Sequence, residues 1–379
     1  MRLIITALIL SAFYVVPALA QPFAYIGNPG SNNLLVLDIS TNGVFDVIGL
    51  DDIPIDVSGP FGVAVTPDGD FVYLTRPGSS KVSVIRTSDN MIVDEVALIA
   101  PDGVAVSLDG DFVYVANGGS NSVSVIRTSD NMVVDTVDLG EQPFAVAVGM
   151  PFGNFIFVTN PNSGNVSVIS TLNMNEVFTT VDVGAAPFGV AVNPMGGFAY
   201  VANAGSNTVS VIDTTPCCTV VDTVDVGQDP FGVAVSLDGD FVYAANSSSN
   251  SVSVIRTPDN TVVDTVDVGQ NPNGVALTPD GKFVYVINVD SENLSVIRTS
   301  DNKVVETADL GVGIGVIGSL GLFISPSTGL PGNPDEPQGS SSGTKNSCAL
   351  AGPGAATSYA PMILFIPAFI LIRRLLRRR

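Results

Sequence analysis

The feature that most constrains this chain is that it repeats itself. The segment FVYVANGGSNSVSVIRTSDN, residues 112–131, returns almost unchanged as FVYAANSSSNSVSVIRTPDN at residues 241–260, and looser copies occur elsewhere. A proline opens each of six copies, and successive prolines are 41–44 residues apart: Pro60, Pro101, Pro143, Pro187, Pro230 and Pro272. A repeat of this length indicates a fold built from like units that stack against their neighbours.

Each copy has the pattern of four short β-strands. In the copy that opens at Pro101 we expect strands at residues 103–107, 112–117, 122–128 and 132–138. The segments LDGD and TSDN between them hold the Asp, Asn and Gly that hairpin turns favour. The first strand is small and apolar, whereas the fourth carries acids, so burial should fall from the first strand to the fourth. Four strands in about 40–45 residues is the size of one propeller blade.

The two ends of the repeat region complement each other. Residues 23–28, 34–40 and 44–49 match the second, third and fourth strands of a copy, and the missing first strand is expected in GIGVIG at 313–318. The sequence therefore predicts an all-β fold: a seven-bladed β-propeller of four-stranded blades, closed by a composite blade from both termini. Such closure leaves only short, protected strand edges.

Two stretches carry a resemblance to a known family. PFGVAVSLDGDFVYAANSSSNSVSVIRTPDN and the FVTN of residues 157–160 resemble the YVTN family of β-propeller repeats, over residues 21–325. The resemblance implies a seven-bladed propeller of the kind found in exported and cell-surface proteins of bacteria and archaea. The roles in that family range from envelope and surface-layer proteins to relatives with catalytic or cofactor-bearing partners. The sequence departs from the family pattern where VIDT becomes VIRT, at Arg86, Arg127, Arg256 and Arg298.

The two termini have the composition of sorting signals. Residues 1–20 predict a secretory signal peptide, with Arg2, an apolar run and an A-x-A site that places cleavage between Ala20 and Gln21. Residues 326–357, rich in Pro, Gly and Ser, are predicted to form a flexible linker. Residues 358–379 are predicted to form an apolar membrane or sorting helix that ends in an arginine cluster. This layout resembles the C-terminal sorting tails of bacterial surface proteins.

Cys348, in SCALAG, is the candidate for tail processing, and a permanent single-pass anchor is the alternative. We expect an exported protein at the cell surface, the outer envelope or the periplasm. It would be membrane-anchored or released after tail processing.

Composition excludes several classes of function. The chain has no histidine, which rules out Ser-His-Asp and Cys-His catalysis and metal sites built on imidazole. Residues 21–325 hold 34 acids and 8 bases, so nucleic acid should be repelled. The sequence predicts no catalytic residue, no metal ligand and no cofactor. The partners it favours are an envelope protein, a glycan or cations, and self-association is a further possibility that the composition leaves open.

One face of the propeller is the candidate binding surface. Phe61, Phe144, Phe188 and Phe231 each precede the innermost strand of a copy, and Asp102 and Asn273 interrupt this set. The phenylalanines have two interpretations, packing between blades or an aromatic rim that receives a partner at the central channel. The loops GGSN, AGSN and SSSN should lie on the same face, which adds Asn121, Asn207 and Asn250 to the candidate residues.

Other polar residues have structural interpretations. The paired acids of LDGD and PDGD fit hairpin turns, because the bidentate Glu of a calcium loop is missing. The arginines of VIRT fit ion pairs with nearby acids. Cys217 and Cys218 fit an incidental oxidisable pair.

The sequence favours a non-enzymatic, envelope-anchored binding scaffold, because a regular repeat offers no unique catalytic constellation. Two alternatives stay open. One is a propeller-type enzyme, such as a lactonase-like hydrolase or a sugar or quinone oxidoreductase. The other is a self-assembling surface-layer component, in which divalent cations bridge the acidic bodies.

Overall fold

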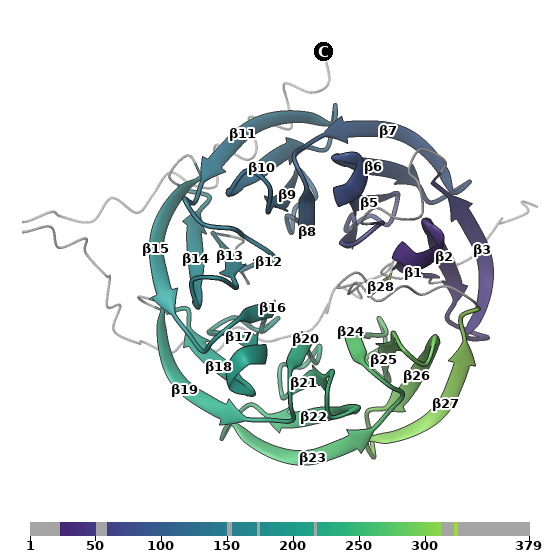
Figure 1. The fold of residues 1–379 in the computed structure, drawn as a ribbon, viewed down its shortest axis with the longest axis vertical. Coiled ribbons are helices and arrows are strands. Elements are labelled where there is room, and N and C mark those ends of the chain that lie inside the picture. The colour runs from purple at the N-terminus through teal and green to yellow at the C-terminus, as the bar shows by residue number, and fades with distance from the viewer. Residues whose placement is uncertain are drawn as a thin grey trace, which may run out of the picture. The chain divides into compact units, whose positions relative to one another are not determined.

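The fold is the predicted seven-bladed, all-β propeller. The computed structural model describes residues 23–50, 59–149, 154–172, 175–215, 218–311 and 322–324. Seven four-stranded antiparallel sheets are arranged in a ring, each with its first strand near the centre and its last at the circumference (Figure 1). By its internal contacts the chain divides at Gly332, and the described residues all belong to the first part. The predicted signal peptide, linker and tail, with Ala20, Gln21 and Cys348, lie outside the described residues.

Each of blades 1 to 4 runs from an innermost strand to an outermost one. Blade 1 consists of β28 (Leu322–Ile324), β1 (Phe23–Asn28), β2 (Asn33–Asp38) and β3 (Gly43–Gly49). Blade 2 consists of β4 (Val63–Val65), β5 (Phe71–Arg76), β6 (Lys81–Arg86) and β7 (Met91–Ala97). Blade 3 consists of β8 (Pro101–Val106), β9 (Phe112–Asn117), β10 (Ser122–Arg127) and β11 (Met132–Asp138). Blade 4 consists of β12 (Val146–Val148), β13 (Phe155–Asn160), β14 (Asn165–Ser170) and β15 (Glu176–Asp182).

Blades 5 to 7 follow the same order. Blade 5 consists of β16 (Pro187–Val192), β17 (Phe198–Asn203), β18 (Thr208–Asp213) and β19 (Thr219–Asp225). Blade 6 consists of β20 (Pro230–Val235), β21 (Phe241–Asn246), β22 (Ser251–Arg256) and β23 (Thr261–Asp267). Blade 7 consists of β24 (Pro272–Leu277), β25 (Phe283–Asn288), β26 (Asn293–Arg298) and β27 (Lys303–Asp309). Three single-turn 3-10 helices are also described: η1 (Pro29–Ser31), η2 (Pro77–Ser79) and η3 (Ala204–Ser206).

The composite blade is confirmed, but its innermost strand lies further along the chain than expected. β28 pairs with β1, so that Phe323 faces Tyr25 as Ala64 faces Tyr73 in blade 2. The expected segment 313–318 lies outside the described residues. The sequence signal is the match of GLFISP, residues 321–326, to GVAVTP, residues 62–67. GIGVIG has the small apolar character of a first strand but lacks the Ser/Thr-Pro that follows the strand in GVAVTP.

Glycine is required at four of the seams where the innermost strands of neighbouring blades meet. A Cβ added to Gly232 would lie 2.1 Å from the carbonyl oxygen of Asn273 in the next blade. The same contact recurs at three other seams, where the distance is 2.4–2.6 Å: Gly62 to Asp102, Gly103 to Phe144 and Gly189 to Phe231. The recurring PFGV and its variants therefore reflect backbone-to-backbone packing around the centre.

The hydrophobic core consists of one cluster at each seam between blades. At the seam of blades 3 and 4, for example, Tyr114 and Val123 pack against Ile156 and Val158. Both faces of a blade are covered in this way, which explains why the second and third strands are buried along nearly their whole length. Buried leucines occur in the two clusters that flank the composite blade, whereas valine and isoleucine predominate in the other five.

Side-chain hydrogen bonds join the outer strands of neighbouring blades. Asn131, at φ 54° in the turn before β11, donates from Nδ2 to Asp94 Oδ2 of blade 2 at 2.9 Å. Its Oδ1 accepts the hydroxyl of Tyr73 at 2.8 Å. The amide-to-carboxylate bond recurs at four more seams: Asn90 to Asp46, Asn175 to Asp135, Asn260 to Asp222 and Asn42 to Glu306. These acids therefore connect the blades as well as face solvent.

The outermost strands carry a β-bulge in all seven blades. In blade 3, Val125 pairs with Asp135 and Ile126 with Val133, which leaves Val134 unpaired. The equivalent residues are all exposed: Phe45, Val93, Val134, Phe178, Val221, Val263 and Val305. Bulges twist a strand edge and so hinder its pairing with another chain.

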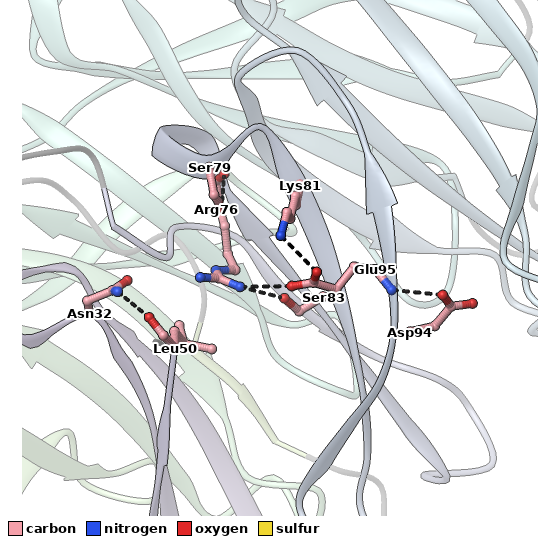
Figure 2. A network of polar contacts seen from close by, with 8 residues as sticks. All are labelled: Asn32, Leu50, Arg76, Ser79, Lys81, Ser83, Asp94 and Glu95. Carbon is pink, nitrogen blue, oxygen red and sulfur yellow. Dashed lines mark hydrogen bonds and ion pairs between the residues drawn. The ribbon is translucent and has the colours of Figure 1, made fainter. Parts of the chain in front are cut away.

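Blade 2 holds a buried arginine where the other blades have a buried asparagine (Figure 2). In blade 3, Asn117 Nδ2 donates to the hydroxyl of Ser124 at 2.8 Å. In blade 2, Arg76 is 1% exposed and its Nη1 donates to the Ser83 hydroxyl at 3.3 Å and to Glu95 Oε1 at 3.1 Å. Burial lowers the pKa of Arg76, and the charge of Glu95 opposes this shift.

We expect Glu95→Gln to lower the free energy of unfolding by about 1–2 kcal/mol, because a buried guanidinium loses a charged acceptor while a neutral one remains. The measurement is the urea midpoint of the full-length chain. Glu176→Gln, at an exposed outer-strand position, is the matched control and should leave the midpoint in place. Equal effects of the two changes would contradict the assignment of Glu95 as the counterion.

Candidate functional site

The four predicted phenylalanines come together at the centre of the ring. Phe61 and Phe144 lie two residues before the first residues of the short strands β4 and β12, whereas Phe188 and Phe231 lie inside β16 and β20. Their ring centroids are 4.6–5.7 Å apart in four pairs: Phe61–Phe144, Phe144–Phe188, Phe144–Phe231 and Phe188–Phe231. Three pairs meet edge to face and one is stacked, which are favourable geometries for aromatic rings. We call these four residues the phenylalanine cluster.

Of the two interpretations drawn from the sequence, the ring contacts show packing between blades, and reception of a partner stays a prediction. The rings of the cluster pack against rings of other blades, and they do so at the central channel. Phe61 is 5% exposed, and the other three rings are half-buried. The apolar surface that remains is the part of the cluster that a ligand could contact.

The central channel holds a cavity of about 90 Å³ next to the cluster. Its walls are the glycines and valines that follow the phenylalanines along the inner strands, such as Gly189, Val190, Gly232 and Val233. Among the described residues that line it, none has a side-chain hydroxyl, amide or carboxylate. This part of the wall offers only backbone polar groups, and the cavity has room for a few waters.

Asp102 stands in blade 3 where four other blades have phenylalanine. Its carboxylate accepts the N–H of Gly118 and is mostly buried. Burial raises the pKa of Asp102 to about 7, and the hydrogen bond from Gly118 opposes this rise. An acid with a raised pKa near a channel is a candidate for proton transfer or ligand binding.

Asn273 holds the equivalent position in blade 7. It is 5% exposed, and its Oδ1 accepts the Ser247 hydroxyl at 2.7 Å. Asp102 lies against Gly118, in the loop of its own blade, whereas Asn273 lies against Ser247, in the loop of the preceding blade. The loops and the phenylalanine cluster share one face of the ring, as predicted, and we call it the cluster face.

The three candidate asparagines lie on the cluster face and shape its loops. Asn121, Asn207 and Asn250 have φ angles of 55°, 57° and 55°, a left-handed conformation that asparagine tolerates. Asn207 Oδ1 accepts the N–H of Asp229 at 3.0 Å, and Asn250 Oδ1 accepts that of Asn271 at 2.9 Å. These contacts hold each loop against the entry to the next blade. The exposed residues between them are glycines and serines.

The acids on the opposite face behave as turn residues. Asp109 Oδ1 accepts the Ser107 hydroxyl at 2.6 Å and the N–H of Asp111 at 3.1 Å, and Asp238 has the same contacts. Each VIRT arginine pairs with the acid three residues later, as in Arg127–Asp130. Within the described residues no three Asp, Glu or Cys side chains group as metal ligands would.

Of the three cysteines, only Cys218 lies within the described residues. Cys218 is buried, at φ 41°, while Cys217 lies outside the described residues, as Cys348 does. No helix in the part of the chain that the structure describes is long and apolar enough to span a membrane.

Comparison with known proteins supports the fold. The family model "Lactonase, 7-bladed beta-propeller" matches residues 171–305, which is about a third of the chain. A protein of unknown function from Desulfotomaculum acetoxidans is 18% identical, with a TM-score of 0.69 over 80% of this chain and 99% of that chain. Hydrazine synthase of Kuenenia stuttgartiensis is 20% identical, with a TM-score of 0.63 over 74% and 93%. No curated protein matches the sequence. At such identities the likeness is one of fold.

Proposed function

We propose that the chain is a non-enzymatic binding scaffold of the cell envelope, and that a basic protein docks on its cluster face. One observation carries this proposal: half-buried phenylalanines meet at the centre of a face on which the loops GGSN, AGSN and SSSN expose glycine, serine and asparagine. An aromatic centre within a polar rim is the usual anatomy of a protein interface. The excess of acids over bases favours a partner of opposite charge.

Cross-linking in intact cells tests this proposal. A photo-activated residue at Ser248, an exposed loop position of the cluster face, should capture a distinct envelope protein. The same residue at exposed Ser88, in a turn of the opposite face, is the matched control and should not capture that protein. Equal capture from both positions would contradict the assignment of the face. Links mainly between copies of the chain would instead indicate a surface-layer component.

A lactone hydrolase is the second candidate, and the family match favours it. Asp102 would then act as the acid or base, because its pKa of about 7 suits proton transfer at neutral pH. The full-length chain should be incubated with γ- and δ-lactones and the acid released followed by titration. Hydrolysis above the spontaneous rate that disappears in Asp102→Asn would replace the scaffold proposal. Hydrolysis at the spontaneous rate would support the scaffold proposal over the lactone hydrolase.

A further inference from the structure

One asparagine makes polar contacts across the seam between blade 1 and blade 7. Asn42 lies at φ 52° in the turn between β2 and β3 of blade 1. Its Nδ2 donates to Glu306 Oε2 in blade 7 at 2.7 Å, and its Oδ1 accepts the Tyr285 hydroxyl, also of blade 7. Asn131 makes the same two hydrogen bonds between blades 3 and 2, but here they connect the first described blade to the last.

Asn42 differs from its equivalents in the residue that follows it. The next residue is Gly43, whereas the five other asparagines at this turn position precede larger residues: Asn90–Met91, Asn131–Met132, Asn175–Glu176, Asn260–Thr261 and Asn302–Lys303. With no side chain on residue 43, its backbone nitrogen can approach Cγ of Asn42 most easily. The Gly43 N–H donates to the Thr41 hydroxyl at 3.3 Å in an exposed turn, a long bond that restrains it weakly.

The other two Asn–Gly pairs of the sequence are protected by burial. Asn117 is 1% exposed, and the N–H of Gly118 already donates to the Ala100 carbonyl at 3.0 Å. Asn273 is 5% exposed and lies within β24. Of the three pairs, Asn42–Gly43 is the one in an accessible turn.

We propose that Asn42–Gly43 is a site of spontaneous deamidation, and that its modification weakens the closing seam of the ring. The Gly43 nitrogen loses its proton and attacks Cγ of Asn42, the Cγ–Nδ2 bond breaks, and ammonia leaves. Water then opens the cyclic imide at either carbonyl to give aspartate or isoaspartate. Overall, one amide and one water become one carboxylate and one ammonium ion.

The product is unfavourable at this position for two reasons. The donor to Glu306 is lost, and a second carboxylate replaces it at hydrogen-bonding distance, where like charges repel. The Tyr285 hydroxyl can still donate to the new carboxylate, so the loss falls on the contact with Glu306. Because Asn42 must release both contacts before its Cγ can be attacked, opening of the seam and deamidation should favour each other.

The test follows the intact, full-length chain during incubation at mildly alkaline pH. Peptide mass spectrometry should find conversion at residue 42 first, before Asn117, Asn273 and the five equivalent asparagines. Asn42→Asp should mimic the product and lower the midpoint of thermal unfolding by about 2–4 °C. Gly43→Ala should block conversion, and it fits, because the added Cβ meets only the Thr41 hydroxyl at 3.4 Å.

A second substitution separates repulsion between the carboxylates at positions 42 and 306 from any other destabilising effect of Asn42→Asp. Glu306→Gln in the Asn42→Asp chain should restore the midpoint, because the new amide can donate to the carboxylate at position 42. Conversion at residue 42 no faster than at Asn117 and Asn273 would overturn the assignment of the site. If Asn42→Asp had the same midpoint of thermal unfolding as the parent chain, the proposal that deamidation weakens this seam would be wrong.

Discussion

Replacing Gly232 by alanine should lower the free energy of unfolding by about 3 kcal/mol. The added Cβ would lie 2.1 Å from the carbonyl oxygen of Asn273, far inside contact distance. That oxygen belongs to the backbone of a central strand, so it cannot rotate away as a flexible side chain could. The two inner strands, β20 and β24, would have to move apart. The urea midpoint of the full-length chain measures the loss.

Blade 4 provides the matched control for Gly232→Ala. Ala145 holds the equivalent position there, and Ala145→Gly removes a methyl group without creating a clash. We expect that change to cost about 1 kcal/mol, from lost burial and greater freedom of the unfolded chain. If both substitutions had the same effect, close backbone packing would not be the reason for glycine in PFGV.

Asp102→Asn should stabilise the protein at pH 8 by about 2–4 kcal/mol and have little effect at pH 4. Burial raises the pKa of this carboxyl from 3.8 to about 7 in the folded state. Between these two values the unfolded chain loses the proton and the folded chain keeps it, so stability falls as the pH rises from about 4 to about 7. An asparagine has nearly the shape of the protonated acid and does not titrate.

The pH profile of unfolding is unusually clear in this chain, because there is no histidine to titrate in the same interval. Unfolding midpoints from pH 4 to pH 8 should fall for the parent chain and stay level for Asp102→Asn. Asp259 gives a contrast of opposite sign, since its bond with Arg256 lowers the pKa to about 2. Asp259→Asn should remove stability that the parent has above pH 4. If the unfolding midpoints of the parent and of Asp102→Asn changed with pH in the same way, the raised pKa could not belong to Asp102.

The strands could be predicted because local patterns determine them. The turns LDGD and TSDN and the graded apolar character of each copy depend on near neighbours in sequence. The innermost strand of blade 1 was misplaced because two segments, 313–318 and 321–326, offer a glycine followed by apolar residues. Only the pairing of β28 with β1 distinguishes them.

The polar and aromatic contacts between blades could not be predicted in the same way. The bond from Asn131 to Asp94 depends on the angle between two blades, which no single repeat encodes. The meeting of Phe61 with Phe144 depends on the radius of the ring. The raised pKa of Asp102 depends on how deeply it is buried, although the sequence did mark it as an exception among the phenylalanines.

The leucines beside the composite blade bear on how the chain avoids misassembly. Repeat proteins with near-identical units are prone to exchange units between copies or to assemble them in the wrong order. Blade 1 has Leu34 where five other blades have valine, and Leu35 where all six have the smaller serine. Between two valine-lined blades these side chains would be overpacked, and a valine-rich blade in the place of blade 1 would leave cavities. Side-chain volume thus favours the order of blades in which blade 1 stands between blades 7 and 2.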